Sequence, residues 1–176
     1  MVTDLRYPIG DFQPTSMLTP AERLLAIEQV AQAPHHLRSA IAGLNPKQRD
    51  TPYREGRWTV RQVVHHLPDS RAHWYIRFKL TLAEQEPTIK PFDEASWAKL
   101  PDSQLTPVEV SLALLDALHQ RWTILLKAMR PEEFARCMNH PERGIISLDY
   151  ALAGCAWHGS HHVAHIASLR ERQGWR

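Results

Sequence analysis

The stretch WHGSHHVAHI, residues 157–166, places four histidines within ten residues. His158 and His162 are four positions apart, and so are His161 and His165. In an α-helix, residues four apart lie on the same face, one turn above the other. Two imidazoles in that arrangement can bind one metal ion if a third ligand comes from another segment. The spacing therefore predicts that one helix supplies two ligands of a metal site.

A helical projection with about 100° per residue separates the two pairs. His162 falls inside the apolar stripe of this segment, and His158 lies on the edge of the stripe. His161 and His165 fall further out, so we expect them either at the rim of the site or behind its ligands. Asp149 falls on the far side of the helix, where a solvated charge belongs. The buried pair is predicted to be His158 and His162.

A second histidine pair, His65 and His66, lies in the segment VVHHLPDS. On its own helix His66 is nearer to the apolar side, and Ser70 and Arg77 continue a polar seam from it. One imidazole from this segment and two from residues 157–166 could converge, and three protein ligands would leave one coordination position open, as in catalytic sites. The stronger motif HExxH is absent. The competing interpretation is that these are hydrogen-bonded core histidines.

Four long helices must position these residues, and no segment is predicted as a strand. Capping boxes at 19–22, 59–62 and 106–109 open three of them, and Ser147 caps the fourth. In the first helix, Leu24, Leu25, Ile27 and Val30 follow helical spacing, and Pro34 is expected to break or bend it. The four helices are expected at residues 20–43, 60–83, 107–130 and 148–174. This pattern predicts an all-α, four-helix bundle.

One connection is much longer than the others. Residues 84–105, between the second and third helices, contain two short polar stretches and the segment DEASWAKL, which could form a short helix. Antiparallel neighbours need only a few connecting residues. The long crossover therefore allows helices two and three to run parallel, or allows a lid to cross the mouth of the bundle. The segment NHPERG, with His140 and Arg143, is expected to form a turn near that mouth.

Composition limits the classes of protein to consider. The chain has 176 residues, 43% hydrophobic and 23% charged, which suits one domain over residues 1–176. The formal charge is +2 with scattered Lys and Arg, so no nucleic acid is expected as a partner. Cys137 and Cys155 cannot form a disulfide framework, which favours the reducing cytoplasm. We expect no signal peptide and no membrane span, and a core position for Cys155.

Five segments carry a resemblance to a known family: TPYREGRWTVRQVVHHLPDS, IRFKL, PTIKPFDEASWAKL, LLDALHQRW and WHGSHHVAHI. Together they resemble the YfiT-like branch of the DinB superfamily over nearly the whole chain. The resemblance implies a four-helix bundle with a long crossover between helices two and three, and a homodimer. It also implies one divalent ion, zinc or nickel, bound by the second His of HH and by two His in the last helix. These correspond to His66, His158 and His162.

One residue departs from the family pattern. Pro68 stands inside the second helix, two residues after His66, where the family has a small residue such as Ala. Proline removes a backbone donor and crowds the carbonyl of Val64. We therefore predict a kink or a broken hydrogen bond at Val64, which could shift His66.

The chemistry expected of such a site is a metal-activated nucleophile. The resemblance implies either a metal-dependent hydrolase or a bacillithiol S-transferase, and a non-catalytic metal-binding stress-response module is the alternative of another class. We favour transfer of a small-molecule thiol to an electrophile, because a thiol needs less help from the protein than water does. Arg54, Arg57 and Arg77 could bind carboxylates of the thiol. The candidates for proton transfer are His161, His165 and Asp69.

Overall fold

The computed structural model describes residues 4–13 and 15–175, and its framework is a bundle of four long helices. In chain order these are α1 (Pro20–Ile41), α3 (Val60–Ala83), α6 (Val108–Ala128) and α7 (Leu148–Gln173). Helix α1 packs against α6 and α7, and α3 packs against the same two helices. Within these ranges no helix combines the length and the apolarity that a membrane span requires. The predicted all-α four-helix bundle is confirmed.

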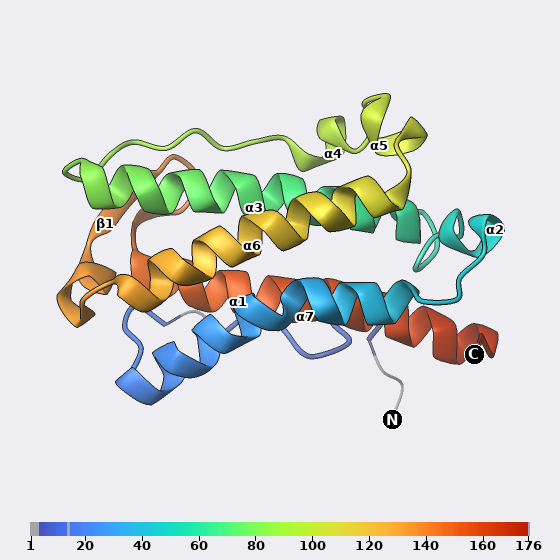
Figure 1. Ribbon diagram of the computed structural model, residues 1–176, viewed down its shortest axis with the longest axis horizontal. Coiled ribbons are helices and arrows are strands. Elements are labelled where there is room, and N and C mark those ends of the chain that lie inside the picture. The colour runs from blue at the N-terminus through green and yellow to red at the C-terminus, as the bar shows by residue number, and fades with distance from the viewer. Residues whose placement is uncertain (1–3, 14, 176) are drawn as a thin grey trace.

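The helices do not alternate in direction. Figure 1 shows α3 and α6 running the same way along the bundle, with α1 and α7 running the opposite way. The crossover between α3 and α6 therefore has to return along the length of the bundle, as the long connection predicts. It contains two short helices, α4 (Glu94–Trp97) and α5 (Asp102–Leu105), the first of which lies in the predicted segment DEASWAKL.

The remaining elements lie at the ends of the bundle. Helix α2 (Pro46–Arg49) joins α1 to α3, and a 3-10 helix, η1 (Pro131–Ala135), follows α6. Two strands, β1 (Cys137–His140) and β2 (Gly144–Ser147), pair as an antiparallel hairpin with Cys137 opposite Ser147. The expectation of no strand is therefore wrong, because strands of four residues carry too little alternation to be recognised. The segment NHPERG spans the hairpin turn, as expected.

Helix ends agree with the sequence at most positions. Thr19 and Thr59 form the predicted capping boxes, Ser147 caps α7, and Gly174 ends α7 with a φ of 64°. The box predicted at Thr106 is wrong, since α6 begins at Val108 without a side-chain cap. Thr106 ends α5 instead, and its backbone N–H donates to the carbonyl of Asp102 at 3.2 Å.

Two prolines lie inside helices that continue past them. Helix α1 includes Pro34, so the expected break is absent, and the buried ring packs inside the bundle. Helix α3 includes Pro68, and residues on both sides of it are helical. Pro68 has no N–H to donate to the Val64 carbonyl. The kink at Val64 stays a prediction.

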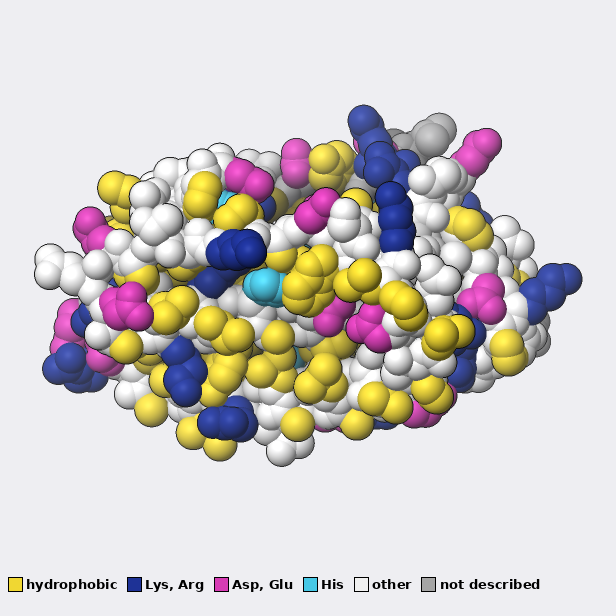
Figure 2. All heavy atoms as spheres, turned by 90° about the horizontal axis from the view of Figure 1, so that it is seen from above, with side chains coloured by type: hydrophobic (Ala, Val, Ile, Leu, Met, Phe, Trp, Pro, Cys, Tyr) yellow, Lys and Arg dark blue, Asp and Glu magenta, His cyan; other side chains and the backbone are white. Residues whose placement is uncertain are grey.

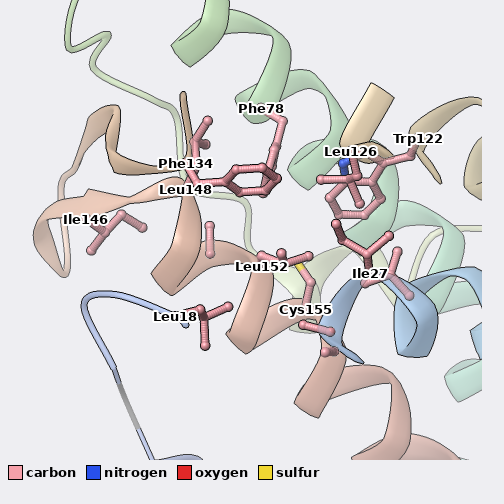
Figure 3. Close-up of a cluster of buried hydrophobic side chains, with 14 of the residues drawn as sticks. Leu18, Ile27, Phe78, Trp122, Leu126, Phe134, Ile146, Leu148, Leu152 and Cys155 are labelled. Atoms are coloured by element: carbon pink, nitrogen blue, oxygen red, sulfur yellow. The ribbon is translucent and has the colours of Figure 1, made fainter. Parts of the chain in front are cut away.

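Two apolar clusters fill the interior. The first surrounds Phe78, Trp122 and Leu152, toward the hairpin end of the bundle (Figure 3), and it includes Cys155 as expected. The second cluster lies toward α2. In α1, Ile27 and Val30 join the core, but Leu24 and Leu25 are 67% and 59% exposed. Helical spacing, which all four residues follow, therefore does not by itself separate these two leucines from the buried face of α1.

Asp149 is buried, so the expectation of a solvated charge is also wrong. Its carboxylate accepts from the Arg23 Nε and Nη2 atoms, both at 2.8 Å, and from the Leu18 backbone N–H at 3.1 Å. The Asp149 side chain is only 3% exposed. The start of α1 and the segment before it cover this face of α7, which the isolated α7 sequence does not reveal.

We predict that Asp149→Ala lowers the free energy of unfolding by about 3 kcal/mol, because it leaves a mostly buried guanidinium without its partner. Chemical denaturation checks this. The matched control is Asp50→Ala, which removes the partner of Arg61 at a position 54% exposed and should cost less than about 1 kcal/mol. Equal losses in the two variants would contradict the structural role given to Asp149.

Candidate metal centre

Three histidines meet between α3 and α7. His66 comes from α3, and His158 and His162 come from successive turns of α7. The Nε2 atom of His158 lies 3.3 Å from Nε2 of His66 and 3.1 Å from Nε2 of His162. One potential ligand atom from each residue lies within 4.8 Å of the other two. His65 points elsewhere, with Nδ1 2.7 Å from the Ser111 hydroxyl, so the structure brings together the three predicted ligands.

The spacing of these nitrogens fits a metal ion. Zinc–nitrogen bonds of about 2.0–2.1 Å in tetrahedral geometry place ligand nitrogens roughly 3.3 Å apart. The two Nε2 separations, 3.3 and 3.1 Å, are close to that value. The buried Nδ1 atoms of His158 and His162 have no partner among the described residues. The set can therefore present three Nε2 lone pairs to one ion.

Burial keeps the three imidazoles neutral. Desolvation lowers the pKa of His66 to about 3, and the nearby Arg71 guanidinium acts in the same direction. The pKa values of His158 and His162 also lie well below their usual range, mainly through desolvation and then through the neighbouring histidines. A ligand imidazole must be neutral to donate its lone pair. Protons should therefore compete weakly with a metal ion at neutral pH.

A cavity of about 330 Å³ opens onto the three histidines; we call it the triad cavity. The crossover contributes Phe92 and Glu94 to its wall, the hairpin turn contributes His140 and Arg143, and α3 contributes Arg77. An ion held by the three imidazoles would therefore keep a coordination position facing the cavity. Figure 2 views the molecule from the side of α4 and α5 and shows apolar, acidic and basic side chains mixed on this face.

Near the hairpin turn, the wall of the triad cavity holds two arginines, Arg77 and Arg143, beside one glutamate, Glu142. Arg77 is buried, its Nη2 donates to the Lys90 carbonyl at 2.7 Å, and its Nε lacks a partner among the described atoms. Across residues 4–13 and 15–175, neither Arg77 nor Arg143 has a carboxylate within ion-pair distance. Burial lowers the pKa of His140, and these two arginines lower it further. An anionic group would find charge partners here.

A second arginine, Arg71, lies in the core beside the metal centre. It is 1% exposed, and its Nη2 donates to the Cys155 carbonyl at 2.8 Å. This close approach to α7 depends on Gly159, since a Cβ there would stand 2.9 Å from Nη2 of Arg71. The glycine where HExxH would carry its glutamate therefore makes room for a guanidinium.

The three candidates for proton transfer lie outside the wall of the triad cavity. The ring of His161 stacks on Trp157 at 4.3 Å, and the ring of His165 stacks on Tyr53 at 4.1 Å. Both histidines are buried, so a rim position is wrong, but the alternative position behind the ligands fits, since their rings lie 5.6 and 5.8 Å from the ring of His162. His158, predicted to be buried, is only partly buried. Nε2 of His165 lies 3.2 Å from the carbonyl of Arg6, in the N-terminal segment. Burial raises the pKa of Asp69 to about 6, and Asp102 adds to the effect. A proton-transfer role for these residues stays a prediction.

Some of the other residues predicted near the mouth line the triad cavity, and others do not. Of the three arginines proposed to frame the mouth, Arg77 lines the triad cavity, whereas Arg54 and Arg57 do not. His140 and Arg143 do line it, as the position of NHPERG suggested. Glu94 and Glu142, which also line it, were missed. No local motif marks them, because only the return of the crossover and the hairpin brings them to the site.

Comparisons with known proteins agree with this geometry. A sequence profile described as the DinB superfamily matches residues 29–166. A Bacillus cereus protein (strain G9842) named "Putative metal-dependent hydrolase" is 52% identical over 174 residues, 99% of this chain and 100% of that protein. A Bacillus mycoides protein (strain KBAB4) of the same name is 52% identical over 172 residues, 98% of this chain and 99% of that protein.

A solved structure extends the comparison to three dimensions. It is that of YfiT from Bacillus subtilis, described as "a probable metal-dependent hydrolase with an unusual four-helix bundle topology". The two structures superpose with a TM-score of 0.94 at 45% sequence identity, covering 98% of this chain and 99% of the other. The unusual topology named for YfiT is consistent with the parallel α3 and α6 found here.

We predict that the protein binds about one divalent ion per chain and that His66→Ala, His158→Ala and His162→Ala each lose it on dialysis. Loss of one of three imidazoles should weaken binding by more than about a hundredfold, because even residues that only support a ligand contribute 10- to 100-fold. Elemental analysis of each variant checks this. His161→Ala, a neighbour outside the set, should keep its ion. Full occupancy in all three ligand variants would refute the assignment.

A second prediction concerns Gly159. Replacing glycine by alanine in a helix usually stabilises it by about 1 kcal/mol, but crowding a packed core costs about 1–3 kcal/mol. We expect Gly159→Ala to lower the free energy of unfolding by about 1 kcal/mol overall, because the added Cβ would displace a buried guanidinium that is hydrogen-bonded to the Cys155 carbonyl. Gly154→Ala, where the nearest atom would be Phe12 Cζ at 3.7 Å, should be neutral or stabilising. Thermal unfolding of the two variants checks this. Equal stability of Gly159→Ala and Gly154→Ala would contradict the close packing of Arg71 against Gly159.

Proposed function

The chain belongs to the DinB superfamily, and from this premise we propose that it is a metal-dependent enzyme that transfers a small thiol to an electrophile. One observation carries the proposal: the triad cavity holds both a candidate metal site and unpaired arginines. Three neutral imidazoles open onto this cavity, and its wall holds Arg77 and Arg143 without carboxylate partners among the described residues. Low-molecular-weight thiols often carry carboxylates, so this wall suits them.

The roles of the chain's own residues follow from their positions. His66, His158 and His162 hold a divalent ion, zinc or nickel in our proposal. Such an ion supplies Lewis acidity that favours the deprotonated form of a thiol or a water beside it. Arg77, fixed by the Lys90 carbonyl and lying over Trp74 at 4.7 Å, orients the carboxylate of the thiol. Trp58 and Phe92 provide apolar walls that restrict water.

The reaction is a substitution at carbon. The thiol loses its proton to solvent, and its sulfur forms a bond to the electrophilic carbon. The bond from that carbon to the leaving group breaks at the same time, and the leaving group departs with the electron pair. The substrate class is therefore a carboxylate-bearing small thiol, such as bacillithiol, together with an electrophile carrying a leaving group.

Hydrolysis is the second candidate. The names of the relatives support it, and so do Glu94 and Glu142, whose carboxylates line the triad cavity and could take a proton from water. A non-catalytic metal-binding module is less well supported. The only potential ligand cluster among the described residues contains three members, and it faces a cavity rather than a fourth protein ligand.

We further propose a homodimer of one-domain chains (residues 1–176) in the reducing cytoplasm. Exposed aliphatic side chains on α1 and α6, including Leu24 and Ile124 at 67% and 70%, support a subunit interface on these helices. Both cysteines are free thiols, which supports a reducing compartment.

The test incubates zinc- or nickel-loaded protein with iodoacetamide and a panel of thiols, in parallel with an ester and amide panel. We expect thiol conjugation, lost in His158→Ala and kept in His36→Ala, an exposed histidine.

Arg77→Gln should raise KM about tenfold or more for carboxylate-bearing thiols, since a charge-assisted hydrogen bond contributes about 1.5–3 kcal/mol. The same substitution should leave KM for 2-mercaptoethanol unchanged. Ester or amide turnover that depends on His158, without conjugation, would establish hydrolysis instead.

A further inference from the structure

A second cavity, of about 260 Å³, adjoins the triad cavity. The two cavities share Trp74, Arg143 and His158 as lining residues. They therefore meet beside one of the three histidines, where a reacting atom would lie. We call the second one the aromatic cavity because its other walls include Tyr7, Phe12, Tyr150 and Trp157.

The walls of the aromatic cavity come from two parts of the chain that are distant in sequence. The N-terminal segment supplies Phe12, whose ring contacts Tyr150 edge to face at 5.7 Å and Trp157 at 5.7 Å. The Trp157 Nε1 donates to the Gly10 carbonyl at 3.3 Å, which fixes this segment against α7. The cavity is thus enclosed by aromatic side chains held in place by mutual contacts.

One residue keeps the space open. Gly154, in the middle of α7, lines the aromatic cavity, and a Cβ there would reach Phe12 Cζ only at 3.7 Å, an ordinary contact. Its φ is not in the left-handed region, so the backbone does not require glycine. A side chain at this position is sterically allowed, and its main effect would be to fill the cavity.

Size and chemistry indicate the ligand. An apolar cavity of about 150 Å³ is enough to bind benzene, so about 260 Å³ accommodates an aromatic ring with a substituent. Aromatic walls favour a planar ring through stacked and edge-to-face contacts. Arg77, which suits a carboxylate, lines only the triad cavity, whereas Arg143 lines both cavities and Asp11 lines only the aromatic one. The two cavities therefore differ in the chemistry they favour.

We propose that the aromatic cavity binds the ring-bearing part of the electrophile, while the triad cavity binds the thiol. This rests on the proposed thiol transfer. The carbon attacked lies where the cavities meet, beside His158; its bond to sulfur forms as its bond to the leaving group breaks, and the leaving group departs with the electron pair. The preferred electrophiles are benzyl-like compounds, rather than small polar ones.

The test compares Gly154→Leu, which fills the aromatic cavity, with Ala167→Leu, which introduces the same side chain at an exposed position of α7. Two electrophiles are used with the same thiol, 4-nitrobenzyl bromide and iodoacetamide. For Gly154→Leu we expect kcat/KM to fall at least tenfold with the benzyl compound and to change less than twofold with iodoacetamide. Ala167→Leu should match wild type with both. Equal effects on the two electrophiles would overturn the inference and leave thiol transfer standing.

Binding of an unreactive analogue separates this inference from the proposed function. We expect 4-nitrobenzyl alcohol to quench tryptophan fluorescence, because Trp74 and Trp157 line the aromatic cavity, and its Kd to rise at least tenfold in Gly154→Leu. If wild type binds 4-nitrobenzyl alcohol more tightly than Gly154→Leu but shows no transferase activity, the ring-binding role of the aromatic cavity is supported and the proposed thiol transfer is refuted. Equal binding to wild type and to Gly154→Leu would overturn the inference whatever the activity.

Discussion

The site depends on holding three neutral imidazoles together at the contact between α3 and α7, with His66 and His162 buried and His158 partly buried. A buried polar group is costly unless it has a partner, and the Nδ1 atoms of His158 and His162 have none among the described residues. Bonds from Nε2 to a divalent ion would have to outweigh this cost, because Nδ1 carries the ring proton when Nε2 binds the ion. The two apolar clusters on either side hold the helices firmly enough to keep the rings together.

The direction of the helices explains why this contact opens onto a cavity. Because α3 and α6 run the same way, the chain must return along the bundle between them (Figure 1). The returning crossover places Phe92 and Glu94 over the histidines, and the hairpin after α6 places His140 and Arg143 beside them. The walls that would recognise substrates are thus supplied by connections, while the ligands are supplied by regular helices.

Local sequence patterns predicted the parts of the fold that depend on local physics. The capping boxes at Thr19 and Thr59 and the placement of His158 and His162 on successive turns of one helix are confirmed, since capping and helical spacing involve residues within one turn. The errors share a tertiary cause. Asp149 was expected in solvent, but the start of α1 and the segment before it cover this residue. Glu94 and Glu142 lie in DEASWAKL and NHPERG, segments that were expected near the mouth, but no local signal singled out their carboxylates.

The central claim is that three imidazoles bind one ion and leave a position open to the triad cavity. X-ray absorption spectroscopy of the zinc-loaded protein, with and without added cysteine, tests it most directly. The account predicts three imidazole nitrogens and one further light atom at about 2.0–2.1 Å, with sulfur at about 2.3 Å replacing that light atom when the thiol is added. Fewer than three imidazoles, or a fourth protein ligand that excludes the thiol, would contradict it.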